Sequence, residues 1–187
     1  MPSPYGRFDH RRGQGKPSPY KFGCGSAARG YLIAAGQAEA KLFGTILTPS
    51  AVEREILDPH APPSVQHWMA ERPPWLQVRE VQTAPDAELT GQLDPGEAEA
   101  IQLAQELRAD ALIMDERRGR QVAAGRGLTV IGVLGMLRES YRRGFIDNPI
   151  ALVVQLRSLG FRASRALTRR FEEQIRELDQ APNRPGD

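Results

Sequence analysis

The chain has 187 residues, of which 40% are hydrophobic and 26% charged, with a formal net charge of +2 and a sequence pI of about 8.9. This is the composition of a globular domain, and an aromatic content of 6% argues against a stacking platform for single-stranded nucleic acid. The single cysteine, Cys24, excludes an intrachain disulfide and a Cys/His zinc site.

The first residues differ in composition from the rest of the chain. Residues 1–24 are rich in proline, glycine and arginine, which predicts a disordered basic leader. A weak alternation of Tyr20, Phe22 and Cys24 indicates a poor strand as the alternative. We expect one folded domain over residues 25–178 and a flexible tail over residues 179–187. No segment has the length and apolarity of a signal peptide or membrane span, so we expect a cytoplasmic protein without a membrane partner.

From Tyr31 onward, short apolar runs alternate with helical patterns. The predicted helices cover 31–43, 49–57, 64–72, 95–108, 116–125, 133–144, 149–160 and 164–180. The predicted strands cover 45–47, 75–81, 111–114 and 128–133, of which the last two are expected to be buried, and residues 83–92 are predicted to form a loop. Ser164 is a predicted N-cap. This alternation predicts an α/β fold whose parallel sheet is covered on both faces, with functional sites at the carboxyl ends of the strands.

Glu97 is the first candidate site residue. Together with Asp94 and Pro95 it fits a capping box, in which Asp94 would accept from an N–H of the helix and Glu97 would reach back. Glu97 also lies in line with Ile101 on the apolar stripe, whereas Glu99 falls on the opposite, polar side. The pattern alone supports a cap and a buried ligand equally.

Asp115 and Glu55 are the other two candidates. Asp115 follows the buried strand ALIM, where it would either cap the next helix or belong to a site at the sheet edge. Glu55 borders the buried side of its helix, three residues after Val52, although an exposed carboxylate is the commoner outcome there.

Three carboxylates near the ends of neighbouring strands would form a site made only of oxygen ligands. Such a site suits a hard cation, Mg²⁺ or Mn²⁺. Clustered carboxylates raise one another's pKa values unless a cation neutralises them. A cation held in this way positions phosphate oxygens and activates water for in-line attack, so phosphodiester hydrolysis is the predicted chemistry.

Four stretches in a fixed order resemble one protein family. LFGTILTPSAVEREI, LDPGEAEAIQLA, ADALIMDERRGRQVA and GLTVIGVLGML are similar to PIN-domain proteins, and most to the small prokaryotic branch related to VapC-type toxins. The resemblance implies a three-layer α/β/α sandwich around a short parallel sheet. It also implies a Mg²⁺-dependent ribonuclease, often a toxin held by a cognate antitoxin. By motif, the family's catalytic and metal-binding acids fall on Glu55, Glu97 and Asp115, the residues that the helix faces also select.

The sequence departs from the family pattern at the first strand. Gly25 and Ser26 stand where the family has Asp and Thr, and the nearest upstream acid is Asp9. We therefore expect a degenerate first strand. One hypothesis is that a shifted reading frame or altered start replaced the opening strand. The other is a PIN-like module that binds nucleic acid or protein without cutting, so the sequence leaves open whether the chain is an enzyme.

Arginines are the candidate RNA contacts. Arg117, Arg118 and Arg120 follow Asp115 and are predicted to bind the nucleic acid, with a solvated helix face as the alternative. A second group, Arg138, Arg142, Arg143, Arg157, Arg162, Arg165, Arg169 and Arg170, crowds the last third, where interleaved acids favour a solvated surface. The closing helices would form either core or a surface for a homodimer or antitoxin. Their apolar positions are Leu152, Val153, Leu156, Leu167 and Phe171.

Overall fold

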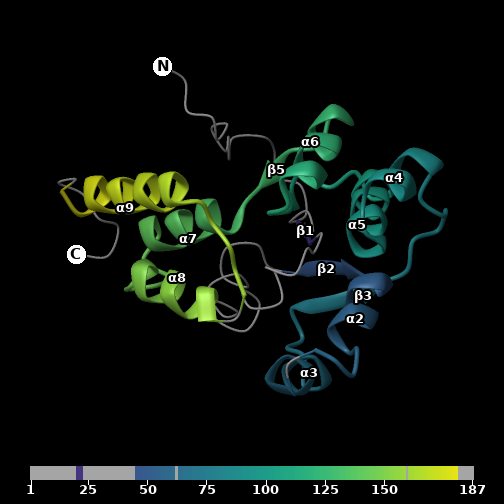
Figure 1. Ribbon diagram of the computed structural model, residues 1–187, viewed down its shortest axis with the longest axis horizontal. Coiled ribbons are helices and arrows are strands. Elements are labelled where there is room, and N and C mark those ends of the chain that lie inside the picture. The colour runs from purple at the N-terminus through teal and green to yellow at the C-terminus, as the bar shows by residue number, and fades with distance from the viewer. Residues whose placement is uncertain (1–19, 23–44, 62, 159, 181–187) are drawn as a thin grey trace, which may run out of the picture.

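A parallel sheet lies at the centre of the fold (Figure 1). The computed structural model describes residues 20–22, 45–61, 63–158 and 160–180. Its strands are β1 (Tyr20–Phe22), β2 (Ile46–Pro49), β3 (Leu76–Arg79), β4 (Leu112–Ile113) and β5 (Val130–Ile131). All pairings are parallel, in the order β3-β2-β1-β4-β5. The predicted α/β class with a parallel sheet is confirmed.

Helices follow most of the strands. They are α2 (Ser50–Ile56), α3 (Pro63–Ala70), α4 (Ala87–Gln92), α5 (Pro95–Glu106), α6 (Arg117–Gly125), α7 (Val133–Arg142), α8 (Pro149–Ser158) and α9 (Arg165–Gln180). The predicted cap of the last helix is confirmed, because the Ser164 hydroxyl accepts from the Leu167 N–H at 3.2 Å. The predicted helix 31–43 lies outside the described residues. Among the helices that are described, none has the length and apolarity to cross a membrane.

Strand β1 lies inside the range predicted to be a disordered leader. Tyr20 pairs with Ile46 of β2, and Lys21 pairs with Leu47 of β2 and with Leu112 of β4. The prediction of disorder is therefore wrong for Tyr20–Phe22, and the alternative of a short strand is confirmed for them. The prediction of disorder rested on the low apolar content of residues 1–24. A strand can nevertheless form there, because the neighbouring strands β2 and β4 supply its backbone hydrogen-bond partners. Residues 1–19 of the predicted leader and 181–187 of the predicted tail lie outside the described residues.

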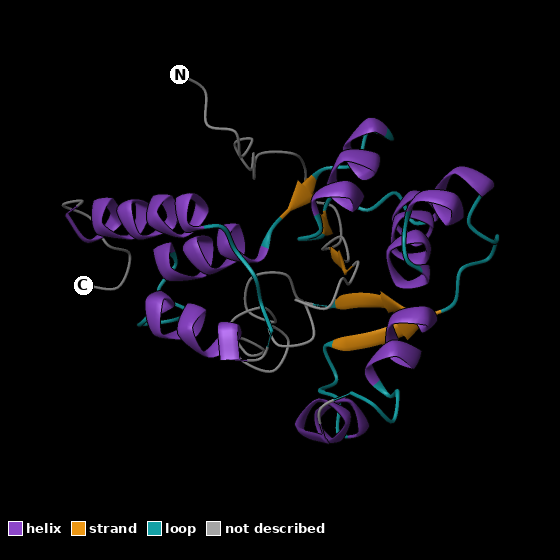
Figure 2. Cartoon of the chain, viewed as in Figure 1, coloured by secondary structure: helices purple, strands orange, loops and turns teal. Residues whose placement is uncertain are grey.

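Strand β4 divides the core into two clusters. Leu112 and Met114 pack with α4, α5 and α6, whereas Ile113 packs with residues of α2, α7, α8 and α9. This is the alternation of successive side chains across a strand. Figure 2 shows the strands between these helices, with α7, α8 and α9 grouped on one side and α4 and α5 on the other. The three-layer arrangement thus follows from the apolar character of both faces of β4.

Two segments differ from their predictions. Residues 83–92, predicted to be a loop, contain α4, where Asp86 caps the helix by accepting from the Leu89 N–H at 2.9 Å. The Thr-Gly pair in this segment has low helix propensity, but the cap and the burial of Leu89 offset it. Strand β5, predicted to be buried, is half-buried because it forms an edge of the sheet.

The strand order creates a switch point at β1 and β4. From β1 the chain builds one half of the sheet through β2 and β3, and the other half through β4 and β5. In open parallel sheets, ligands bind outside the carboxyl ends of the strands at such a point. Asp115 follows β4 closely and lies near this position.

Glu99, predicted to lie on the polar side of its helix, binds the start of α2. Its carboxylate accepts from the Ala51 N–H at 2.8 Å and pairs with Arg54 at 3.1 Å, and its side chain is 15% exposed. The N-cap residue of α2, Pro49, makes no side-chain cap of its own. Glu99 therefore caps a helix distant in sequence.

We expect Glu99→Ala to lower the free energy of unfolding by about 1–2 kcal/mol, because the Ala51 N–H loses its acceptor. Urea denaturation would measure the change. Glu80→Ala is the matched control, since Glu80 is exposed. Equal stability of the Glu99→Ala variant and the wild type would contradict this role.

Candidate metal centre

Glu97 is a buried carboxylate with an unsatisfied oxygen. The residue is 3% exposed, and its Oε1 has no hydrogen-bond partner among the described residues. Burial is the main cause that raises the pKa of Glu97 to about 7, and the negative charges of Asp94, Glu116 and Glu55 raise it further. The prediction that Glu97 faces the interior is confirmed, and its role stays a prediction.

The predicted capping box is half formed. The backbone N–H of Asp94 interacts with the Glu97 carboxylate and partly offsets the rise of its pKa. The side chain of Asp94, however, makes no cap hydrogen bond. The cap and the ligand interpretations of Glu97 are therefore compatible, because the N–H contact leaves Oε1 available.

The absence of a side chain at Gly119 leaves space for the Glu97 carboxylate. A Cβ atom on Gly119, in the first turns of α6, would lie 3.0 Å from Oε1 of Glu97 and 2.4 Å from the Met114 sulfur. The second distance is too short for a real contact, so a larger residue would displace Met114 or the helix. Gly119 thus lets α6 approach the carboxylate closely.

Glu55 is half-buried and binds the start of α5. Its Oε1 accepts from the Gly96 N–H at 3.1 Å. A Cβ on Gly96 would lie 2.7 Å from the same oxygen, so the glycine permits this approach. The contact brings Glu55 beside Glu97, and its charge contributes to the raised pKa of that residue.

Asp115 binds the start of α7, so the alternative in which it caps α6, the next helix in the chain, is wrong. Its Oδ1 accepts from the Val133 N–H at 3.1 Å. Its Oδ2 is buried without a hydrogen-bond partner in the described part of the chain. Burial raises the pKa of Asp115 to about 6, against the opposing effects of the Val133 N–H and the Arg120 charge. The local sequence could not show this contact. Val133 lies 18 residues from Asp115 along the chain, and only the fold brings the free N–H groups at the start of α7 to the carboxylate.

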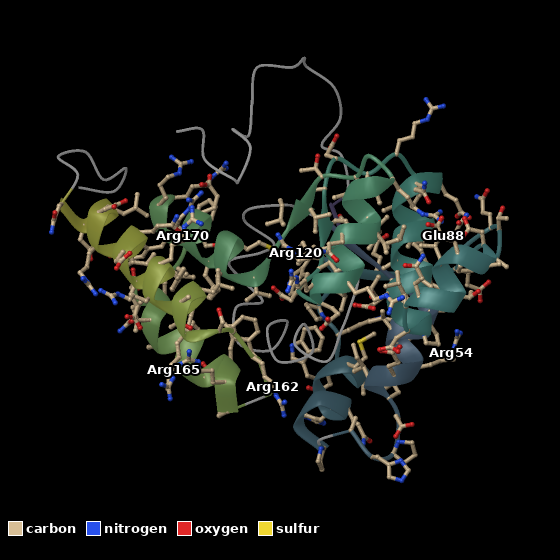
Figure 3. All side chains as sticks on the ribbon, turned by 45° about the horizontal axis from the view of Figure 1, so that its top comes forward. Arg54, Glu88, Arg120, Arg162, Arg165 and Arg170 are labelled. Atoms are coloured by element: carbon tan, nitrogen blue, oxygen red, sulfur yellow. The ribbon has the colours of Figure 1, made fainter. Side chains whose placement is uncertain are left out.

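Arg120 lies on the Asp115 side of the site. Its Nη1 donates to the Met114 carbonyl at 2.9 Å, and a Cβ on Gly132 would lie 2.7 Å from Nη1 and 3.2 Å from Oδ1 of Asp115. Arg117 and Arg118 are exposed on α6. Figure 3 shows Arg120 beside α6 near the middle of the molecule, whereas Arg162, Arg165 and Arg170 lie around α8 and α9.

The structure brings the three predicted acids together only in part. Glu55 lies beside Glu97, and Asp115 lies beside Arg120. Across the described ranges, no three Asp, Glu, His or Cys side chains are placed to hold one metal ion. The predicted convergence of three carboxylates is therefore not seen there, because the N–H of Val133 holds Asp115 at the start of α7 while Glu97 interacts with Asp94.

The side chains still fit a hard divalent cation. Glu97 and Asp115 each offer a buried carboxylate oxygen without a partner among the described groups. Mg²⁺ commonly binds through one or two carboxylates and keeps several waters, so a preformed cage of three acids is not required. Burial raises the pKa at both positions, and a bound cation would favour the ionised carboxylates.

Many arginines of the last third have partners within their own helices. Arg142 and Arg143 bind Glu139, and Arg169 binds Glu173. These pairs favour the prediction of a solvated surface. Among the apolar positions of the same segment, Val153, Leu156 and Phe171 are buried in the core, whereas Leu152 is partly buried and Leu167 is 39% exposed.

Comparison with known proteins identifies the family. The family model of the PIN domain matches residues 31–177. The chain belongs to the PIN domain family, which is associated with nuclease-type folds and generally binds divalent metal ions. No curated protein and no solved structure matches the chain.

Proposed function

We propose that this protein is a PIN-type ribonuclease that depends on Mg²⁺ or Mn²⁺. The observation that carries the proposal is Glu97, a 3% exposed carboxylate with an unpartnered oxygen and a raised pKa, beside the start of α6, the helix that follows β4. Its surroundings are acidic, so a bound cation would relieve the repulsion. Membership in the PIN domain family supports the same class of reaction.

Each site residue has a distinct task in this proposal. Glu97 and Asp115 offer their unpartnered oxygens to the cation, and Glu55, which binds the Gly96 N–H, adds negative charge beside Glu97. When bound, the cation neutralises phosphate charge and lowers the pKa of water for in-line attack on the phosphodiester. Arg120 faces the Asp115 side, where a guanidinium can bind a phosphate oxygen, and the exposed Arg117 and Arg118 can contact phosphates further along the RNA.

A second candidate is a PIN-fold module that binds nucleic acid or protein without cutting. One sequence feature favours it: no Asp or Glu occurs between Asp9 and Glu39, so no carboxylate closely follows β1. The family places its first site acid there. In this case the raised pKa values of Glu97 and Asp115 would remain from an ancestral site.

The proposal extends to the biological role of the protein, its partner and its location. We propose a toxin related to the VapC type, with RNA as target, a cognate antitoxin as partner and the cytoplasm as location. A homodimer through α8 and α9 would use the exposed apolar side chains Val154 and Leu167, which are 63% and 39% exposed. Co-expression with the protein encoded beside it in the genome would test the antitoxin.

Cleavage of a fluorescently labelled RNA would test the proposed reaction. We expect hydrolysis that requires Mn²⁺ or Mg²⁺, stops with a chelator, and falls at least about 100-fold in Glu97→Gln and in Asp115→Asn. Glu80→Gln removes an exposed acid and is the matched control. RNA binding without metal-dependent cleavage would overturn the proposal in favour of the non-catalytic module.

A further inference from the structure

Two acids near Glu97 occupy N-cap positions without acting as caps. Asp94 precedes α5 and Glu116 precedes α6, and neither side chain makes a cap hydrogen bond. Both residues are exposed, and neither side chain forms an ion pair with another described residue. An N-cap side chain stabilises a helix by accepting a hydrogen bond from one of its free N–H groups. The side chains of Asp94 and Glu116 make no such bond, so they do not have this structural function.

Both acids precede helices that meet at the Glu97 carboxylate, because Glu97 lies in the first turn of α5 and Gly119 of α6 approaches it. The N–H of Asp94 interacts with the Glu97 carboxylate, which holds the two residues together at the start of α5. Glu116 is the N-cap residue of α6 and precedes Gly119 by three residues. Oε1 of Glu97 lies 3.0 Å from the Cβ position of Gly119, so the first turn of α6, which Glu116 precedes, approaches the same carboxylate.

The charges around this oxygen are negative. Asp94 is the charge that most strongly disfavours ionisation of Glu97, Glu116 is next, and Glu55 follows. Glu97 is 3% exposed and its Oε1 has no partner in the described structure. Like charges around a buried, unpartnered carboxylate are unfavourable in the absence of a cation. The cluster therefore has the composition of a site for a divalent cation.

We propose that Asp94 and Glu116 form an acidic rim that increases the affinity of the Glu97 site for a divalent cation by acting through water. The inference deepens the proposed function and rests on its metal site. Contact through water is consistent with the lack of three described side chains placed to ligate one ion directly. The rim supplies negative charge in a site where no carboxylate closely follows β1. It thereby compensates for the acid missing from that position.

Titration of Mn²⁺ into the full chain by calorimetry tests the rim. We expect Glu116→Gln and Asp94→Asn each to weaken Mn²⁺ binding about three- to tenfold, because each removes one charge near the cation. Matched controls remove exposed acids elsewhere: Glu80→Gln, and Asp110→Asn at the amino end of β4, opposite the site. These controls should bind Mn²⁺ as the wild type does.

The outcomes separate the rim from the proposed function. If Glu97→Gln abolishes Mn²⁺ binding but Glu116→Gln and Asp94→Asn bind like the controls, the rim is wrong and the metal site remains. If the wild type binds no Mn²⁺, both ideas fail. Thermal unfolding in a chelator adds a second readout: removal of a rim charge should raise the Tm, because repulsion of Glu97 is relieved. A lower Tm in both variants would contradict this repulsion and overturn the rim.

Discussion

The metal-free protein should become less stable as the pH rises from 5 to 8, and Glu97→Gln should remove much of this loss. The pKa of Glu97 is raised from 4.5 to about 7, so the folded state binds a proton more tightly than the unfolded chain does. Between these values the folded state holds more protons, and its stability falls with rising pH until Glu97 is ionised. The loss amounts to up to about 3 kcal/mol for this residue.

Urea denaturation at several pH values, in the presence of a chelator, would measure this loss. Asp115, whose pKa is raised to about 6, should leave a smaller dependence of the same sign in the Glu97→Gln variant. Glu139 has a pKa lowered to about 2, so its contribution lies below this range. Saturating Mn²⁺ should reverse the trend, because the cation binds the ionised carboxylates. A chelated wild type that is equally stable at pH 5 and pH 8 would contradict the raised pKa of Glu97.

Two substitutions of Asp115 should separate its charge from its hydrogen bond. Asp115→Asn keeps an oxygen that can accept from the Val133 N–H, but it removes the negative charge from the site. We expect metal-dependent RNA cleavage to fall at least about 100-fold with little loss of stability. Asp115→Ala removes the acceptor as well. It should lose the same activity and also about 1–2 kcal/mol of stability, because the start of α7 loses its cap.

Asp110→Asn is the control for both substitutions. Asp110 is exposed and precedes β4, whereas Asp115 follows it, so the same strand carries an acid at each end. The control should keep wild-type cleavage and stability. Full activity of Asp115→Asn would show that the Asp115 charge is not needed, and equal stability of the two Asp115 variants would rule out the cap of α7.

Local pattern was enough for the parts of the fold that depend on neighbouring residues. The alternation of apolar runs and helical patterns predicted the parallel sheet, because buried strands and amphipathic helices each have their own period. The same periodicity placed Glu97 on the buried side of α5, where it is 3% exposed. Local signals indicated β1 only as a weak alternative to disorder, because its pairing with β2 and β4 depends on residues elsewhere in the chain.

The sequence by itself determined that Glu97 faces the interior, and the tertiary structure decided what each acid binds. Asp115 was expected either to cap the next helix or to belong to a site at the sheet edge, and it binds the N–H of Val133, 18 residues away. Glu99 was expected to be on a polar face, yet it binds the N–H of Ala51, 48 residues away. The free N–H groups at the start of a helix can donate to any carboxylate that lies near them. Only the packing of the helices around the sheet decides which carboxylate that is.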